Sequence, residues 1–247
     1  MRAVFAAAVI ILLGASCFAE DAPKVQTTAP DADVIAVVLG RKITVKEKDR
    51  LNGVIFGALM EQYTKENKIE PTTEELDAFV QKTEEKEKLQ EAKFERDSEK
   101  LKQELKESSI TDKNRKDKEA QLQTFEKFLK NKRDIKERTK GMEELMKTSR
   151  RQIAQNFVRA WKLNKALYAQ YGGRVIFQQA GAEPLDAYRD LLKEQEKKGA
   201  FQIIDKNYEA PFWKYFTNDS MHTFYSKSEG EKFINTPWWM MEEPHEK

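Results

Sequence analysis

The sequence predicts a mainly α-helical protein: a small helical body with a short N-terminal strand, and a long charged antiparallel helical hairpin. Charged residues make up 35% of the 247 residues, against about a quarter in an average globular chain. Aromatic residues still reach 10%, including four Trp, which separates the chain from disordered proteins. The ten Gly and seven Pro are too few for a chain dominated by loops.

Composition also excludes several classes of function. Lys and Arg number 44 against 42 Asp and Glu, so the chain lacks the basic excess of a nucleic-acid-binding protein. One Cys and two His leave too few ligands for a zinc or iron–sulfur site. The sequence has no Gly-x-Ser-x-Gly, His-Glu-x-x-His or phosphate-binding Gly-rich motif. We therefore predict no catalytic residue, no metal, no cofactor and no small-molecule substrate.

The N-terminus indicates export. Residues 1–19 combine Arg2 with an apolar run over residues 3–13 and small residues before Glu20, which is the pattern of a cleaved signal peptide. The run is shorter than the roughly twenty residues that span a bilayer. Residues 20–33 then form a polar tether. We expect a periplasmic protein.

Two alternatives stay open for this segment. Gly14-Ala15-Ser16 precedes Cys17, so the chain is alternatively a lipoprotein anchored at that cysteine, and membrane association is expected only in that case. A buried N-terminal helix is the other interpretation of the apolar run.

The predicted body begins with residues 34–80. Val34–Leu39 is a short, mostly β-branched run, which indicates a buried strand. Thr44 and Glu47 have the spacing of a capping box, in which each side chain bonds the other residue's backbone N–H. This box predicts a helix from Val45 to about Glu66, with apolar residues at helical spacing.

A second capping box, in residues 72–75, predicts the helix that leads into the hairpin. We call residues 81–150 the arm. Charges of both signs are interleaved along it, and its sparse apolar residues recur at spacings of three, four and seven. This pattern predicts two long helices that meet along a thin seam and turn near residues 108–112. The alternative is a solvated single helix or a partly disordered segment.

Residues 151–171 resume a strong apolar stripe and complete the predicted body, ending at Gly172-Gly173 as a C-cap. The tail, residues 172–247, is rich in aromatic residues. It contains a short strand or extended segment at residues 175–177 and a helix over residues 184–198. We expect the tail to pack on the body, because so many aromatic rings are costly to leave in water.

Part of the body resembles a known family. The matching residues are Val34-Ile35-Ala36-Val37-Val38, Gly40, Ile43-Thr44 and Thr73-Glu74-Glu75-Leu76. They resemble the start of the SurA-type periplasmic chaperone domain, where a short strand and an Ile-Thr pair lead into an amphipathic helix and then a Thr-x-Glu-Glu-Leu helix start. Leu39 stands where the family usually has Asn. In that family a later helix returns to pack on the first, a role that residues 153–171 suit.

The resemblance implies an exported chaperone that holds unfolded or nascent envelope proteins in apolar grooves between helices. The candidate client contacts are apolar or aromatic residues of the two body helices: Phe56, Met60, Tyr63, Phe157 and Trp161. For each of them, the sequence favours burial between helices over contact with a client.

Two other functions compete with this one. The first is a structural or adaptor envelope protein that docks one partner through its hairpin. The second is a relative of the prolyl isomerases, because many SurA-type chaperones carry a parvulin domain. The paired His and Gly-rich strand pattern of that domain are missing here, so we expect the purified protein to lack prolyl isomerase activity.

Overall fold

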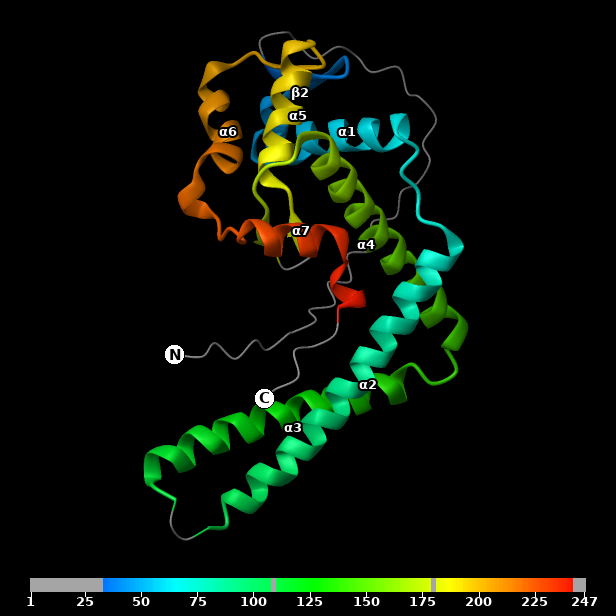
Figure 1. Ribbon diagram of the computed structural model, residues 1–247, viewed down its shortest axis with the longest axis vertical. Coiled ribbons are helices and arrows are strands. Elements are labelled where there is room, and N and C mark those ends of the chain that lie inside the picture. Colours follow the sequence, from blue (N-terminus) through cyan, green and yellow to red (C-terminus); the bar gives the residue numbers. More distant parts are fainter. Residues whose placement is uncertain (1–32, 108–109, 179–180, 242–247) are drawn as a thin grey trace.

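The computed structural model describes residues 33–107, 110–178 and 181–241, and within them the fold is mainly α-helical (Figure 1). The chain up to residue 171 contains β1 (Val34–Val38), β2 (Arg41–Thr44), α1 (Leu51–Glu66), α2 (Thr73–Glu104), α3 (Asp112–Arg138) and α4 (Glu143–Tyr171). The tail contains β3 (Ile176–Gln178), β4 (Gly181–Glu183), α5 (Leu185–Lys197), β5 (Phe201–Ile203), α6 (Glu209–Thr217), α7 (Lys227–Asn235) and the 3-10 turn η5 (Trp238–Met240). The predicted signal peptide and most of the predicted tether lie outside the described residues.

A three-stranded antiparallel sheet has the order β2-β1-β5. The turn between β1 and β2 uses Leu39 and Gly40, whose φ angles of 49° and 78° are both positive, as the tight hairpin turns that match strand twist require. The edge strand β5 comes from the tail, with Val38 opposite Phe201. The tail therefore pairs with the first strand through backbone hydrogen bonds, in addition to the side-chain packing that the sequence predicts.

The segment after β2 differs from the prediction in its first turns. The capping box of Thr44 and Glu47 is present, but it starts a 3-10 helix over Val45–Arg50, and α1 begins only at Leu51. Val45–Arg50 contains no buried residue. Because tertiary packing supplies most of a helix's stability, the α-helix begins where its residues first reach the core.

The main core joins the sheet to α1, the end of α4, and the tail helices α5 and α6. Its fully buried side chains include Ile35, Ile43, Ile55, Leu167, Leu191, Leu192, Phe201 and Phe212. Residues from both ends of the chain thus share one apolar cluster, which fixes the tail against the strands.

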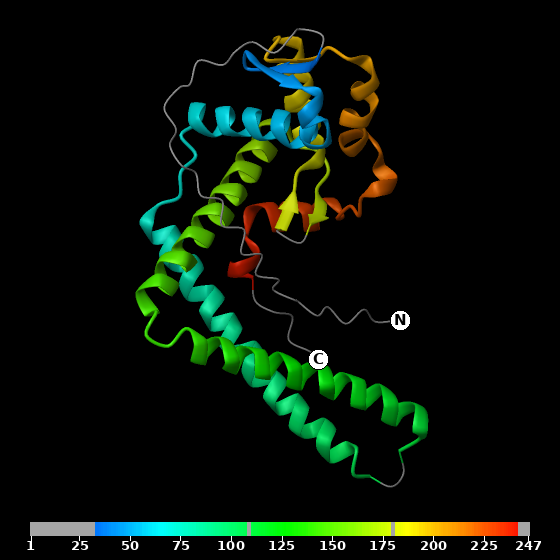
Figure 2. The ribbon, with the colours of Figure 1, turned by 180° about the vertical axis from the view of Figure 1, so that it is seen from behind.

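The arm is a packed helical hairpin, but its return limb is broken. α2 runs without interruption for 32 residues, whereas the returning chain divides into α3 and α4 at the elbow, Thr139–Met142. Gly141 has a φ of 81° there, a conformation that ends helices. The distal half of α2 therefore pairs with α3 and its proximal half with α4 (Figures 1 and 2). The prediction of two helices over residues 81–150 was wrong at this break.

Inside the arm, Phe94 of α2 stacks on Phe125 of α3 with ring centroids 4.7 Å apart, and meets Phe128 edge-on at 4.7 Å. These contacts contradict the alternative of a solvated single helix. Ion pairs such as Lys132–Glu87, at 3.0 Å, link the limbs. Ion pairs that remain partly exposed contribute little stability, so the aromatic contacts supply most of the stability of the hairpin.

Deleting residues 87–147 and joining α2 to α4 with a short Gly-Ser loop is expected to leave a cooperatively folded protein. Among the described residues of the arm, only Ser98, Leu101 and Leu129 are buried, so little apolar area is lost. Thermal unfolding followed by circular dichroism checks this. Disappearance of the cooperative transition would contradict it.

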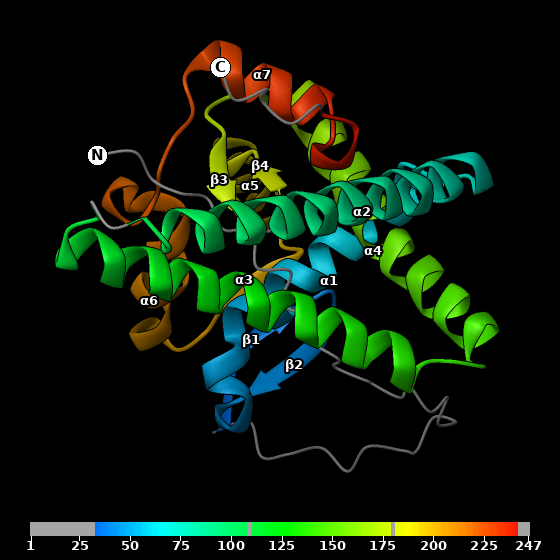
Figure 3. The same cartoon turned by 90° about the horizontal axis from the view of Figure 1, so that it is seen from below.

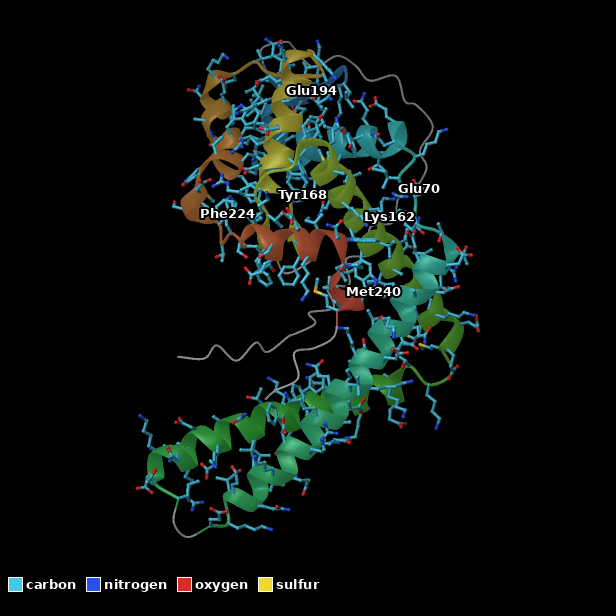
Figure 4. The ribbon with its side chains drawn as sticks, in the orientation of Figure 1. Glu70, Lys162, Tyr168, Glu194, Phe224 and Met240 are labelled. Carbon is cyan, nitrogen blue, oxygen red and sulfur yellow. The ribbon has the colours of Figure 1, made fainter. Side chains whose placement is uncertain are left out.

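A second apolar cluster, the root cluster, lies where α2 and α4 leave the body. Its buried members are Leu76, Phe79, Ala154, Val158 and Trp239. Figure 4 shows Lys162 of α4 close to Glu70, whose carbonyl oxygen accepts a 2.9 Å hydrogen bond from the Lys162 ammonium.

In the part of the chain that the structure describes, no helix combines the length and apolar character that crossing a membrane requires.

Candidate functional site

The described surface contains an aromatic pocket on the side of the body that faces the arm. Its volume is about 160 Å³, and its lining comes from the β3–β4 hairpin, α7 and the C-terminal end of the described chain. Figure 3 shows α7 next to the β3–β4 hairpin, and α7 contacts β4. The lining residues are Phe177, Gln178, Gly181, Ala182, Tyr225, Phe233, Trp238 and Met241. None of them carries a charge.

Backbone pairing positions the floor of the pocket. Phe177 lies opposite Ala182 in the β3–β4 ladder, and its N–H donates to the carbonyl oxygen of Thr223 at 3.1 Å. The stretch after Thr223 therefore runs beside β3, which brings Tyr225 against Phe177 with ring centroids 6.1 Å apart. A capping box at Ser226 then starts α7.

The wall of the pocket comes from α7 and η5. α7 packs closely because Gly230 is buried, and a Cβ on that residue would lie 3.0 Å from the Cβ of Val175. Phe233, on the same helix, packs against Tyr225 with ring centroids 4.5 Å apart and ring planes tilted by 36°. Lys86 of α2 donates a 2.6 Å hydrogen bond to the carbonyl oxygen of Met241, which ties the last described residue to the arm.

Several apolar side chains at this site are exposed. Phe177 is 48% exposed, Trp238 38% and Met240 48%. Figure 4 shows Met240 on η5, at the edge of the body nearest the arm. Single exposed apolar residues are ordinary, whereas an exposed group beside an uncharged pocket indicates a binding surface.

A polar cluster adjoins the pocket and shares Gln178 with it. Tyr215 of α6 donates a 3.3 Å hydrogen bond to Glu183, and its hydroxyl oxygen accepts one of 3.2 Å from Gln178. His222 binds the carbonyl oxygen of Tyr215 through Nε2 at 2.6 Å. Burial raises the pKa of Glu183, and burial together with the nearby Glu183 charge raises the pKa of Tyr215 to about 12.

The hairpin is held to α5 by an arginine clamp. The Arg174 guanidinium and backbone N–H bond Asp186 at 2.8–3.0 Å, and the same guanidinium bonds Asp219 at 2.6 Å. The Arg174 guanidinium also lies 4.2 Å from the centre of the Phe224 ring, a residue labelled in Figure 4. Burial opposes ionisation of Asp186, but the Arg174 hydrogen bonds outweigh it and lower its pKa. The clamp is a structural ion-pair network, with all of its carboxylates paired.

Three of the sequence-predicted contact residues lie on α1, away from the pocket. Met60 and Tyr63 are buried in the main core, and the Tyr63 hydroxyl donates to Gln170 at 2.7 Å. Phe56 is partly buried and meets Tyr188 edge-on with ring centroids 4.9 Å apart.

The other two predicted contacts lie on α4, beside the pocket. Phe157 packs against Phe79, and against Trp238 at 5.9 Å between ring centroids. Trp161 donates its indole N–H to the carbonyl oxygen of Ile234 at 2.8 Å and meets Trp239 edge-on. All five predicted residues are thus engaged in packing, and their role as client contacts stays a prediction.

Sequence reasoning missed the pocket residues themselves. The density of aromatic residues in the tail was the available signal, but it does not predict which rings lie together in the fold.

Within the described residues, no group of His, Cys, Asp and Glu side chains is placed to hold a metal ion. No protein-family model, curated protein or solved structure matches the chain.

Proposed function

We propose that the protein is an exported, periplasmic, non-catalytic chaperone that holds unfolded or nascent envelope proteins. The observation that supports this most is the uncharged aromatic pocket beside exposed Phe177, Trp238 and Met240. An unfolded chain exposes apolar side chains in no fixed sequence. A ring-lined pocket suits such side chains because apolar burial is non-directional.

The size of the pocket limits the free energy that each client contact contributes. An apolar cavity of roughly 150 Å³ holds a benzene molecule, so a pocket of about 160 Å³ accepts one Phe or Leu side chain. Burial of one such side chain contributes about 1.5–3 kcal/mol. A single contact of this strength is weak and easily reversed, so holding requires several contacts along one client.

The five residues of α1 and α4 fit this proposal indirectly. Because they are packed, we assign client contact to the exposed rings next to Phe157, in particular Trp238, rather than to the five side chains themselves. Phe56, Met60 and Tyr63 then stabilise the body that supports the pocket.

Replacing Phe177 with Ser is expected to weaken client holding about tenfold while leaving the fold intact. Phe177 lines the pocket and is 48% exposed, and loss of about 1.5 kcal/mol of apolar contact corresponds to about tenfold in affinity. The measurement is suppression of aggregation of several unrelated unfolded proteins, such as reduced insulin and denatured lysozyme, near equimolar ratio.

Leu145→Ser is the matched control, because Leu145 is 64% exposed but lies next to the elbow. It is expected to hold clients as the parent protein does. If the two variants lose activity equally, the pocket is not the holding site. If the parent protein suppresses no aggregation, the chaperone proposal is wrong.

A second candidate function is an adaptor that docks one partner through the hairpin. It is favoured by exposed apolar side chains at the elbow, namely Ile135, Met142 and Leu145. Capture of one partner from the cell envelope, lost in Leu145→Ser and kept in Phe177→Ser, would favour the adaptor over the chaperone.

A further inference from the structure

We propose that Glu183 makes the aromatic pocket responsive to pH, so that a proton on its carboxyl group holds the β3–β4 hairpin firmly on the body and keeps the pocket formed. As pH rises and Glu183 ionises, the hairpin opens more often and the pocket binds more weakly. The inference rests on the proposed function only for the identity of the molecule that the pocket binds. The device itself is a property of the fold.

One hydroxyl group links both strands of the hairpin. Glu183 is the last residue of β4, where it lies opposite Ile176, a fully buried residue of β3. The Tyr215 hydroxyl donates to Glu183, and it accepts a hydrogen bond from Gln178, which ends β3 and lines the pocket. Loss of the Glu183 proton therefore acts on Gln178, a lining residue, through one shared atom, the Tyr215 hydroxyl oxygen.

A second link runs through the neighbouring residue of β4. The Asn164 side chain of α4 donates a 3.1 Å hydrogen bond to the carbonyl oxygen of Ala182, which also lines the pocket. The Asn164 side-chain oxygen accepts from the hydroxyl of Tyr188, a buried residue of α5, at 2.5 Å. The Ala182 backbone is thus fixed to the same polar layer as Glu183.

Few of the described groups around Glu183 stabilise its ionised carboxylate. The ionisable groups that act on it are Tyr215, by a hydrogen bond, and His222, by its charge. Tyr188 of α5 also feels the Glu183 charge. On α7, the other helix packed against β4, Glu229 bonds Ser226. On α4 the link is the uncharged Asn164 side chain.

The sign of the pH effect follows from burial. Burial raises the pKa of Glu183 above its ordinary value, so the folded hairpin binds this proton more tightly than the open chain does. The Glu183 contribution to stability is full below the ordinary carboxyl pKa and is lost as pH rises through the raised pKa. The hydrogen bond from Tyr215 and the charge of His222 lower the Glu183 pKa, but burial outweighs both.

Hydrogen exchange tests the device directly. We expect the protection factors of residues 176–178 and 181–183, corrected for intrinsic exchange, to fall between pH 4 and pH 8 in the parent protein. The fall is about tenfold for each unit by which the Glu183 pKa is raised. In Glu183→Gln, whose amide keeps the shape without the charge, protection is expected to stay high across the range. The same fall in both proteins would overturn the proposal.

A second readout needs no variant. The carboxyl carbon of Glu183 in the intact, isotopically labelled protein is expected to titrate above the ordinary range of a Glu side chain. Titration within or below that range would overturn the proposal, whether or not Glu183→Gln folds.

Pocket occupancy is measured with N-phenyl-1-naphthylamine, an uncharged apolar dye whose phenyl ring has the size that the pocket accepts and whose fluorescence rises on binding. Its affinity is expected to fall from pH 4 to pH 8 in the parent protein and to stay constant in Glu183→Gln. Dye affinity that follows pH equally in both proteins would contradict the coupling. If the device is found but no unfolded protein is held, the proposed function fails and the pH response stands.

Discussion

Replacing Trp239 with Ala is expected to lower the free energy of unfolding by about 3–5 kcal/mol, the range for truncating a buried aromatic side chain. Trp239 is 4% exposed and belongs to the root cluster. Its ring meets Phe79 of α2 at 4.9 Å and Trp161 of α4 at 5.9 Å, both edge-on. Truncation leaves a cavity between α2 and α4, and the other side chains of the root cluster fill it only in part.

Trp238→Ala is the matched control. The adjacent ring is 38% exposed, so its loss removes less buried area and leaves no enclosed cavity. Urea unfolding followed by far-ultraviolet circular dichroism compares the two variants. Equal losses would contradict the burial of Trp239 between α2 and α4.

Gly173→Ala is expected to lower the free energy of unfolding by about 2–5 kcal/mol. Gly173 has a φ of 92°, and a Cβ there would lie 2.4 Å from the Cβ of Asp186. Backbone strain of about 1–2 kcal/mol adds to about 1–3 kcal/mol for forcing atoms apart. Because the obstructing atom is attached directly to the α5 backbone, relief requires α5 to shift and disturbs the Arg174–Asp186 bonds.

Gly172→Ala separates strain from steric clash. Gly172 also has a positive φ, 66°, but no atom lies within 4 Å of its ideal Cβ position. It is expected to lose less stability than Gly173→Ala by about 1–3 kcal/mol, the cost of the clash alone. Urea unfolding of both variants gives the difference. Indistinguishable midpoints would show that α5 does not approach Gly173 as closely as the structure indicates.

Local sequence signals predicted much of the fold. The capping boxes of Thr44 and Thr72 are both present, because a cap depends on residues only three positions apart. Gly172 ends α4, and Gly199 follows α5 with a φ of 73°. Each of these positions depends on backbone conformations that short-range sequence determines.

Long-range features could not be predicted in the same way. β5 is three residues long, and Phe201 faces the core only because β1 lies beside it. The elbow depends on Gly141 and on α2 being long enough to pair with two successive helices. Tertiary contacts determine which helix α2 packs against at each point. The apolar spacing along α2 does not show where its neighbour changes from α4 to α3.

The candidate site also depends on tertiary contacts, because its residues come from separate segments of the chain. Phe177, Tyr225 and Trp238 are far apart in sequence and line one pocket. Apolar spacing led instead to Met60 and Tyr63, which are core residues. Periodicity identifies the face of a helix that is buried, so it favours core residues over the exposed rings of a binding surface.

Site-specific photocrosslinking tests the central claim, client binding in the aromatic pocket, most directly. A benzophenone side chain is placed at position 177 in one protein and at position 145 in another, and each is irradiated with several unrelated unfolded proteins. We expect crosslinks from position 177 to all of them, reduced when a second unfolded protein competes, and few from position 145. Equal yields at the two positions, or none at position 177, would contradict the account.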